Sequence, residues 1–178
     1  MNKRSILLVL FLLIGTTVAY SQKFGYVDTN FILSKMEEYK EAQAEIEQVS
    51  QKWQEEVQTM YKEIDRMYNE FKAEEVLLTQ EMKDERLAAI KKKENEVKDY
   101  QKKVFGFEGL FFLKKQELMK PVQDKVFDAV EKVAKNNRLQ IVFDKSGDLV
   151  MIYTDPIHDY TDYVLEDLGL GDEVDTIK

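Results

Sequence analysis

The 178-residue chain has no cysteine, only two prolines and a single histidine. Without cysteine it cannot form disulfides or zinc–thiolate sites, and it has neither a cysteine nucleophile nor a thiol to carry a lipid. The histidine, His158, lies between Asp155 and Asp159 near an expected helix start, where a capping or surface role is usual. No P-loop, dinucleotide-binding, serine-hydrolase or zinc-protease motif occurs. The sequence therefore predicts no enzyme, no metal site and no cofactor.

Glycine and proline are also absent from the whole segment 26–105. Apolar residues recur in its first half with a mean spacing of about 3.5, the period of a coiled coil, and more faintly in its second half. We expect one continuous helix from a cap at 28–30 through Phe71, followed by a returning helix. The result is an antiparallel hairpin over residues 37–120, with its tip near 76–80. Arms of roughly 45 residues would reach ~65–70 Å.

Charge is uneven along the chain. Residues 37–85 hold 15 acidic and 6 basic residues, residues 86–138 hold 8 and 14, and residues 139–178 hold 10 and 2. Antiparallel packing of the first block on the second sets opposite charges side by side, which favours this pairing although each exposed pair contributes little. The net charge of −8 argues against nucleic acid as a partner, because such binding needs a basic surface.

Short apolar runs flank the expected hairpin and predict strands. Residues 24–28 are aromatic and β-branched, which is typical of a strand. Residues 139–144 and 149–154 are two apolar runs joined by a glycine-containing turn, and they predict a β-hairpin. Three short strands make a poor core alone, and an exposed sheet edge favours association. We therefore expect an oligomer whose sheets merge.

Two further helices are expected after the hairpin. Pro121 should begin the first, since proline breaks a helix that runs through it, and this helix should end at 136–137. The second should begin at Pro156 and end at Gly169. The predicted fold class is α+β and mostly α. Its small β body comprises 22–36 and 121–170, the hairpin projects from it, and the polar tail 171–178 follows.

The first 21 residues predict a secretory signal peptide. A basic start, an apolar run at 6–14 and small residues before a cleavage site after Ser21 follow the usual order. The apolar run is shorter than the roughly 20 residues of a membrane-spanning helix. We therefore expect a single exported domain, residues 22–178, which in a bacterial envelope lies in the periplasm.

The segment VFGFEGLFFL, residues 104–113, interrupts the charged return arm. Its aromatic residues are Phe105, Phe107, Phe111 and Phe112. Their steps of 2, 4 and 1 cannot place all four on one coiled-coil stripe. Either some of them face a binding cavity or another subunit, or the patch fills the junction between arm and body. Gly106 and Gly109 weaken the helix here, and we interpret them, together with Pro121, as hinges.

Further apolar side chains lie toward the expected hairpin tip. Methionine and aromatic side chains suit promiscuous contact when they stay exposed, because methionine is flexible and polarisable. These additional candidate binding residues are Met60, Tyr61, Met67, Tyr68 and Phe71.

Both ends of the chain resemble the Skp/OmpH family of periplasmic chaperones. The similarity rests on FGYVDTNFIL at 24–33, and on LQIVFD and LVMIYTDPIHDYTDYVLEDL within 139–168. The resemblance implies a homotrimer in which three helical hairpins hang from a β body. The hairpins would enclose unfolded outer-membrane β-barrel proteins without ATP and prevent their aggregation. Carried over by position, the oligomer body would contain Tyr26, Val27, Ile141, Val142, Phe143, Met151 and Ile152.

This chain departs from the best-known members of that family, which are basic and hold acidic clients and lipopolysaccharide. Because the chain is acidic, no lipopolysaccharide site of spaced lysines and arginines is assigned to it, and membrane contact has no support in the sequence. The alternative function is an exported coiled-coil scaffold of the cell envelope without chaperone activity. That alternative predicts a continuous apolar seam and few aromatic side chains outside it.

Overall fold

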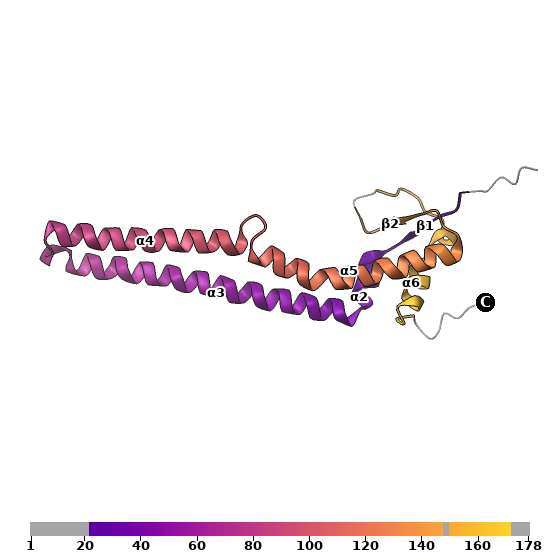
Figure 1. Cartoon of the computed structure of the whole chain (residues 1–178), viewed down its shortest axis with the longest axis horizontal. Helices are drawn as coiled ribbons and strands as arrows, with labels where there is room; N and C mark the ends of the chain where they lie inside the picture. Colours follow the sequence, from indigo (N-terminus) through magenta and orange to yellow (C-terminus); the bar gives the residue numbers. More distant parts are fainter. Residues whose placement is uncertain (1–21, 148–149, 172–178) are drawn as a thin grey trace, which may run out of the picture.

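The computed structural model describes residues 22–147 and 150–171, which form a small body with a long helical hairpin projecting from it (Figure 1). In chain order the elements are β1 (Phe24–Val27), α2 (Thr29–Lys35), α3 (Glu37–Glu74), the 3₁₀ turn η1 (Glu75–Leu77), α4 (Gln80–Phe105), α5 (Leu110–Asn137), β2 (Ile141–Asp144), the 3₁₀ turn η2 (Pro156–His158) and α6 (Thr161–Asp167). The predicted fold class, α+β and mostly α, is confirmed.

The hairpin is formed by α3 and by the returning helices α4 and α5. With 38 residues, α3 is about 57 Å long. The chain turns at η1, and the Thr79 hydroxyl caps α4 by accepting a hydrogen bond of 3.4 Å from the amide of Met82. The distal seam is narrow. Its fully buried residues are Ile64, Ile90 and Val97, against which Met60, Met67 and Phe71 pack.

Ion pairs join the two arms with the polarity that the charge blocks predict. In each pair the acid lies on α3 and the base on the returning arm. The four pairs are Glu74–Arg86, Glu63–Lys93, Glu45–Lys114 and Glu38–Lys125. All of these groups are at least a quarter exposed, so the pairs fix the register more than they stabilise the hairpin.

The body has a wider core where α2, α5 and α6 meet the sheet. Asp28 caps α2 by accepting from the amide of Phe31 at 2.9 Å, and its own amide donates to the Thr161 hydroxyl at 3.0 Å. These bonds tie the first helix to the last. The buried residues of the body core are Val27, Ile32, Met36, Ala42, Val122, Val126, Ala129, Val133, Tyr160, Val164 and Leu165.

The predicted β-hairpin over 139–154 is wrong. Strand β2 pairs in parallel with β1, with Phe24 opposite Ile141, and residues 150–154 form no strand. Residues 148–149 lie outside the described residues. The side chains of Ile152 and Tyr153 are 98% and 82% exposed, so no described residue covers an apolar strand there. The sheet of the described residues therefore has two strands rather than three.

The predicted continuous helix from 28–30 to Phe71 is also wrong, because the chain breaks at Met36. Met36 has an extended backbone, with φ −80° and ψ 128°, and separates α2 from α3. Its side chain is 1% exposed and lies in the body core beside Ile32. Burial of this side chain fixes the break, which lets α2 pack in the body while α3 leaves it.

Pro121 does not begin a helix but lies inside α5, contrary to prediction. Its missing N–H leaves the carbonyl of Glu117 without a helical donor. Pro121 is exposed, whereas Val122 beside it is buried in the body core, so that carbonyl lies on the solvent side of the helix. Water can satisfy it, and core packing on the opposite side preserves the helix.

The last helices follow the prediction more closely at their C-terminal ends than at their starts. Helix α5 ends at Asn137, as predicted, and Arg138, rather than Asn136 or Asn137, adopts the left-handed conformation that caps it, with φ 57°. The expected helix from Pro156 is a 3₁₀ turn, and α6 begins only at Thr161. Asp155 caps the turn as expected, accepting from the amide of Ile157 at 3.1 Å.

Candidate functional site

The main candidate surface lies where the returning arm is interrupted between α4 and α5. There the chain leaves the helix and stands out from the hairpin as a small loop (Figure 1). Helix α4 ends as the amide of Gly106 donates to the carbonyl of Lys102 at 2.8 Å, and the amide of Gly109 donates to the carbonyl of Gly106 at 2.9 Å. Glu108 has a left-handed backbone with φ 51°. The loop is therefore a hydrogen-bonded turn.

Both glycines of the loop are required by close backbone contacts. A Cβ on Gly106 would lie 2.2 Å from the carbonyl oxygen of Lys102, and a Cβ on Gly109 would lie 2.5 Å from that of Val104. Backbone atoms cannot move aside as a flexible side chain can, so side chains at these positions would disrupt the turn. A hinge role for Gly106, Gly109 and Pro121 remains a prediction.

The aromatic residues of the loop region separate into inward and outward groups. Phe111 packs edge-on against Trp53 with ring centroids 6.5 Å apart, and its centroid lies 6.0 Å from that of Phe105. Phe107 is 97% exposed at the loop, and Phe112 is 49% exposed. Phe111 thus packs between the two arms, while Phe107 is exposed at the loop. A client role for the patch, and a role at the junction between arm and body, remain predictions.

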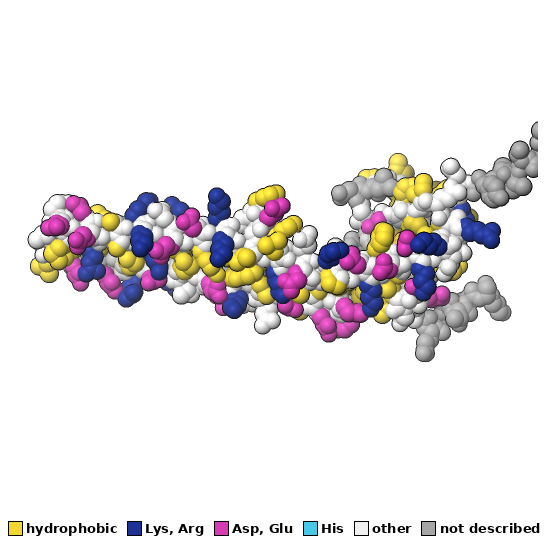
Figure 2. Space-filling view, viewed as in Figure 1, with side chains coloured by type: hydrophobic (Ala, Val, Ile, Leu, Met, Phe, Trp, Pro, Cys, Tyr) yellow, Lys and Arg dark blue, Asp and Glu magenta, His cyan; other side chains and the backbone are white. Residues whose placement is uncertain are grey.

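Phe112 lines a hollow on the body side of the break. This hollow has a volume of about 990 Å³ between α2, α3 and α5. Its apolar lining includes Leu33, Tyr39, Ile46, Phe112 and Met119. Figure 2 shows hydrophobic side chains around the break and on the body, and others along the arm and at its tip among charged side chains.

The candidates toward the tip also divide into two groups. Met60, Met67 and Phe71 pack into the narrow seam, so part of each side chain is committed to the hairpin itself. Tyr61 and Tyr68 are 44% and 37% exposed, and each hydroxyl reaches across to the returning arm. These bonds run from Tyr61 to Gln101 at 3.2 Å and from Tyr68 to Glu94 at 3.1 Å.

Polar contacts across the arms shift the pKa of several groups. The hydrogen bond from Tyr100 to Glu56, assisted by partial burial, raises the pKa of Tyr100 to about 12. The hydrogen bond from Lys93 lowers the pKa of Glu63. At neutral pH Tyr100 therefore stays protonated and Glu63 stays ionised. Both groups can thus keep the hydrogen bonds that join the two arms.

Residues expected in an oligomer body lie on two sides of the sheet region. Tyr26 and Val27 are buried within this chain, at 5% and 3% exposure, and so contribute to its own core. The others are wholly or partly exposed: Ile141, Val142, Phe143, Met151 and Ile152. A further hollow, of about 350 Å³, lies between β2 and α5 and is lined in part by Phe127, Val130 and Phe143. Association through these residues remains a prediction.

The remaining candidate chemistry is structural. His158 stacks on Phe24 with ring centroids 4.8 Å apart. Within residues 22–147 and 150–171, no three acidic or histidine side chains gather as a metal site would require. Over the same ranges, no helix combines the length and apolarity that a membrane crossing requires.

These features define the class of protein: a small α+β body that carries a charged helical hairpin with aromatic side chains exposed at a break. The sequence model of the family Outer membrane protein (OmpH-like) matches residues 23–168. The chain therefore belongs to the OmpH-like family, as its two ends predict.

Two relatives bear on this assignment. An uncharacterized protein of Aquifex aeolicus (strain VF5) is 28% identical over 151 residues, which cover 85% of this chain and 88% of the relative. The crystal structure of an OmpH-like protein from Caulobacter crescentus CB15, described as a candidate outer membrane chaperone, matches with a TM-score of 0.67 at 14% identity and covers 92% of each chain. At that identity the second similarity shows the shared fold.

Sequence reasoning missed a groove on the distal side of the break. It is lined by residues of α3 and α4 that lie outside the apolar pattern, including Gln54, Gln58, Lys98 and Lys102. The available signal was the pair of glutamines one turn apart on α3, a helix whose commonest polar residue is glutamate.

Proposed function

We propose that the protein is an ATP-independent holdase chaperone of the periplasm. It binds unfolded outer-membrane β-barrel proteins in a cavity between helical hairpins and keeps them from aggregating on their way to the outer membrane. Membership of the OmpH-like family supports a chaperone role of this kind. The working unit is a homotrimer, with one hairpin from each chain.

The observation that carries this proposal is the outward placement of aromatic side chains at the break. A rigid scaffold needs only a buried seam, yet Phe107 is 97% exposed on a turn whose backbone contacts require glycine at positions 106 and 109. The two hollows beside the break are also lined by apolar side chains, among them Phe105 and Phe112. Exposed apolar patches of this kind mark binding surfaces.

Weak, scattered contacts suit a barrel protein in transit. Strands of an unfolded barrel alternate apolar and polar residues, so no single segment offers a large apolar surface. Several shallow sites within one cavity hold such a chain by effective concentration, while each contact still breaks quickly. Folding of the client into the membrane then drives release, and no nucleotide is needed.

Exposed apolar side chains on the body support association into a trimer. Ile152 is 98% exposed, Ile157 is 74% exposed and Phe127 is 67% exposed, an unusual density for a domain of this size. Pairing of residues 150–154 with the sheet of a neighbouring chain would cover them. The hairpins of the three chains would then extend in the same direction.

The decisive experiment measures mass by light scattering. Residues 22–178 are measured alone and after a urea-unfolded outer-membrane barrel protein is diluted into them in buffer without nucleotide. We expect a trimer that gains the mass of one client and keeps it soluble. A trimer that leaves the client to precipitate would overturn the holdase and favour an envelope scaffold.

A double substitution tests the surface itself. Phe107→Ser/Phe112→Ser should reduce client capture while the trimer persists. Val76→Ser/Leu77→Ser at the hairpin tip is the matched control, because it removes two residues that are also exposed, at 89% and 82%. Undiminished capture by trimeric Phe107→Ser/Phe112→Ser would contradict a client role for the break, and loss of the trimer would assign these residues to assembly.

A further inference from the structure

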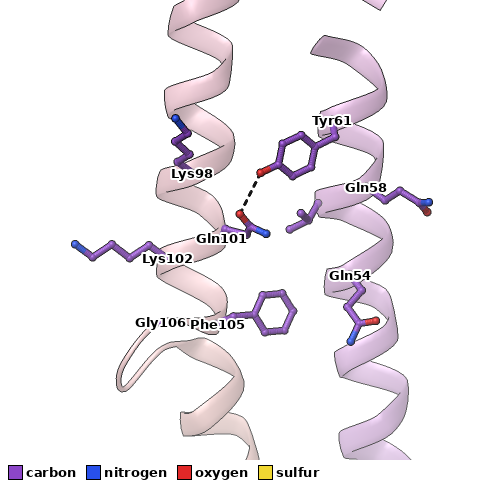
Figure 3. Close-up of a pocket in the computed structure, with 9 residues that line it drawn as sticks. Gln54, Gln58, Tyr61, Lys98, Gln101, Lys102, Phe105 and Gly106 are labelled. Atoms are coloured by element: carbon purple, nitrogen blue, oxygen red, sulfur yellow. Dashed lines mark hydrogen bonds between the residues drawn. The ribbon is translucent and has the colours of Figure 1, made fainter. Parts of the chain in front are cut away.

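A shallow groove crosses one face of the hairpin on the distal side of the α4–α5 break (Figure 3). It has a volume of about 770 Å³ and lies between α3 and α4. In Figure 3 the rings of Tyr61 and Phe105 lie between the two helices, while the lysine side chains mark the outer edge of α4 and Gln58 that of α3. The lining residues are Gln54, Val57, Gln58, Tyr61, Lys98, Gln101, Lys102, Phe105 and Gly106.

The floor of the groove is apolar and partly open. Val57 is 7% exposed and closes the floor, whereas Tyr61 and Phe105 are 44% and 39% exposed. The Tyr61 hydroxyl donates to the side-chain carbonyl of Gln101 at 3.2 Å, which holds its ring across the groove. The two exposed rings lie on opposite arms, so an aromatic side chain placed between them would contact both. Such contacts between rings stabilise a bound aromatic side chain beyond the burial of its area.

The rims of the groove differ in charge from the rest of the hairpin. Elsewhere α3 places a glutamate opposite the bases of the returning arm. Along the groove it places Gln54 and Gln58 on one rim, while α4 places Lys98 and Lys102 on the other. Neither lysine forms an ion pair with a described residue. Glu94, one turn before Lys98, is bonded to Lys91 and Tyr68, and the charge of Lys98 also helps to lower the pKa of Glu94.

These observations identify the chemistry of the occupant. Two cations that form no direct ion pair with a described residue, one turn apart beside an apolar floor, complement an aromatic group flanked by carboxylates. Lysine stems pack on apolar surface while the ammonium groups stay in water, so they can approach a bound chain without burial of charge. The amides of Gln54 and Gln58 can both donate to and accept from a peptide backbone.

We propose that this groove binds extended client segments in which an aromatic residue has an acidic residue two positions away. In an extended chain, residues two apart point to the same side and lie roughly 6.6 Å apart. The aromatic ring would lie on Tyr61 and Phe105 while the carboxylate reaches Lys98 or Lys102. This inference rests on the proposed function and names the kind of client segment that one of its sites selects.

The test uses two synthetic peptides and ¹⁹F NMR. The first is acetyl-GSDGWGDGS-amide with 5-fluorotryptophan at its centre, and the second carries asparagine in place of both aspartates. Broadening of the ¹⁹F line is titrated with residues 22–178. Two exposed ion pairs should make the acidic peptide bind roughly five-fold more tightly than the neutral one.

Two double variants locate the effect. Lys98→Gln/Lys102→Gln should abolish the preference for the acidic peptide. Lys62→Gln/Lys92→Gln makes the same change in net charge at exposed lysines outside the groove and should retain it. Equal binding of the two peptides, or an undiminished preference in Lys98→Gln/Lys102→Gln, would overturn the proposal. The proposal would also be overturned if the protein bound phosphatidylglycerol vesicles, if only Lys98→Gln/Lys102→Gln lost that binding, and if neither peptide displaced the vesicles.

The outcome is separable from that of the proposed function. A chain that keeps a barrel protein soluble but does not discriminate between the peptides is still a holdase, and only this inference fails. A chain that discriminates between the peptides but leaves the barrel protein to precipitate loses the holdase function, although the groove binds as argued.

Discussion

The body and the distal hairpin are built from the same helical material but are stabilised in different ways. Eleven buried residues from α2, α3, α5, α6 and β1 form the core of the body. The distal hairpin has a core of Ile64, Ile90 and Val97, and two helices alone must cover it. Hydrophobic stabilisation grows with the apolar area removed from water, so most of the folding free energy resides in the body.

This difference between body and hairpin explains why the hairpin has many exposed apolar side chains. A two-helix seam covers only one stripe of each helix, and side chains beside the stripe remain in solvent. Polar bonds such as Tyr61–Gln101 and Tyr68–Glu94 hold the arms in register where apolar contact is thin. The arm is therefore free to offer apolar surface to a partner at little cost to its own stability.

The largest effect should come from the core of the body. Ile32→Ala removes a fully buried side chain and should lower the free energy of unfolding by ~2–5 kcal/mol. Urea unfolding followed by circular dichroism at 222 nm measures it. Phe31→Ala is the control, because Phe31 adjoins Ile32 but is 44% exposed. Equal losses in the two variants would contradict the assignment of the core.

A smaller and more local effect is expected in the hairpin. Ile90 is 2% exposed in the distal seam, and Ile90→Ala should cost about 2 kcal/mol, the lower end for such a truncation, because neighbouring side chains can relax toward solvent. Hydrogen exchange should accelerate in α3 and α4 and remain unchanged in α5 beyond Val122 and in α6. Equal acceleration in α6 would show that arm and body unfold as one unit.

Substitutions at the break between α4 and α5 should distinguish aromatic residues that pack on the hairpin from those that are exposed to a partner. Phe111→Ala removes the contact with Trp53, which should cost about 1 kcal/mol for the aromatic pair in addition to the apolar area that Phe111 buries. Phe107→Ala should change stability by less than about 0.5 kcal/mol, as surface substitutions do. Emission of Trp53, the single tryptophan, should shift to the red only in Phe111→Ala. A matching shift in Phe107→Ala would place that ring against the arm.

The smallest effect is the pH dependence of the ion pairs between the arms. Hydrogen bonds from lysine lower the pKa of Glu38 and Glu63 below the ordinary value of 4.5. Their contribution is present above pH 4.5 and is lost as the pH falls through the lowered values. Thermal unfolding at pH 3.5 should therefore begin at a lower temperature than at pH 7. Glu38→Gln/Glu63→Gln should reduce this difference, and an unchanged difference would assign it to other carboxylates.

Local signals in the sequence predicted the hairpin well. The 3.5-residue period and the charge blocks both act between residues close along the chain or opposite each other in a regular hairpin. The sheet was mispredicted because β1 and β2 lie more than a hundred residues apart, and turn chemistry after β2 favoured a local partner that does not form. The break at Met36 and the position of Pro121 follow from burial in the body core, which local propensity does not report.

The candidate surface was predicted only in part. The spacing of the four phenylalanines showed that they cannot share one stripe, but not which of them face outward. That division depends on the turn at Gly106–Gly109, whose geometry is set by backbone contacts with Lys102 and Val104. The groove was missed because it is marked only by neutral residues, Gln54 and Gln58. Their lack of charge becomes informative only when the ion pairs between the arms elsewhere are known.

The loop between α4 and α5 also sets the direction in which the apolar stripe of α5 faces relative to that of α4. A straight α-helix drifts by about 20° per heptad from a seven-residue repeat, so an unbroken helix from Gln80 to Asn137 would turn its apolar stripe by roughly 160° over its length. Residues 106–109 lie outside the helices and let α5 begin at its own angle. The distal arm could therefore gain or lose whole heptads during evolution while the body keeps its packing, which makes hairpin length an independent variable.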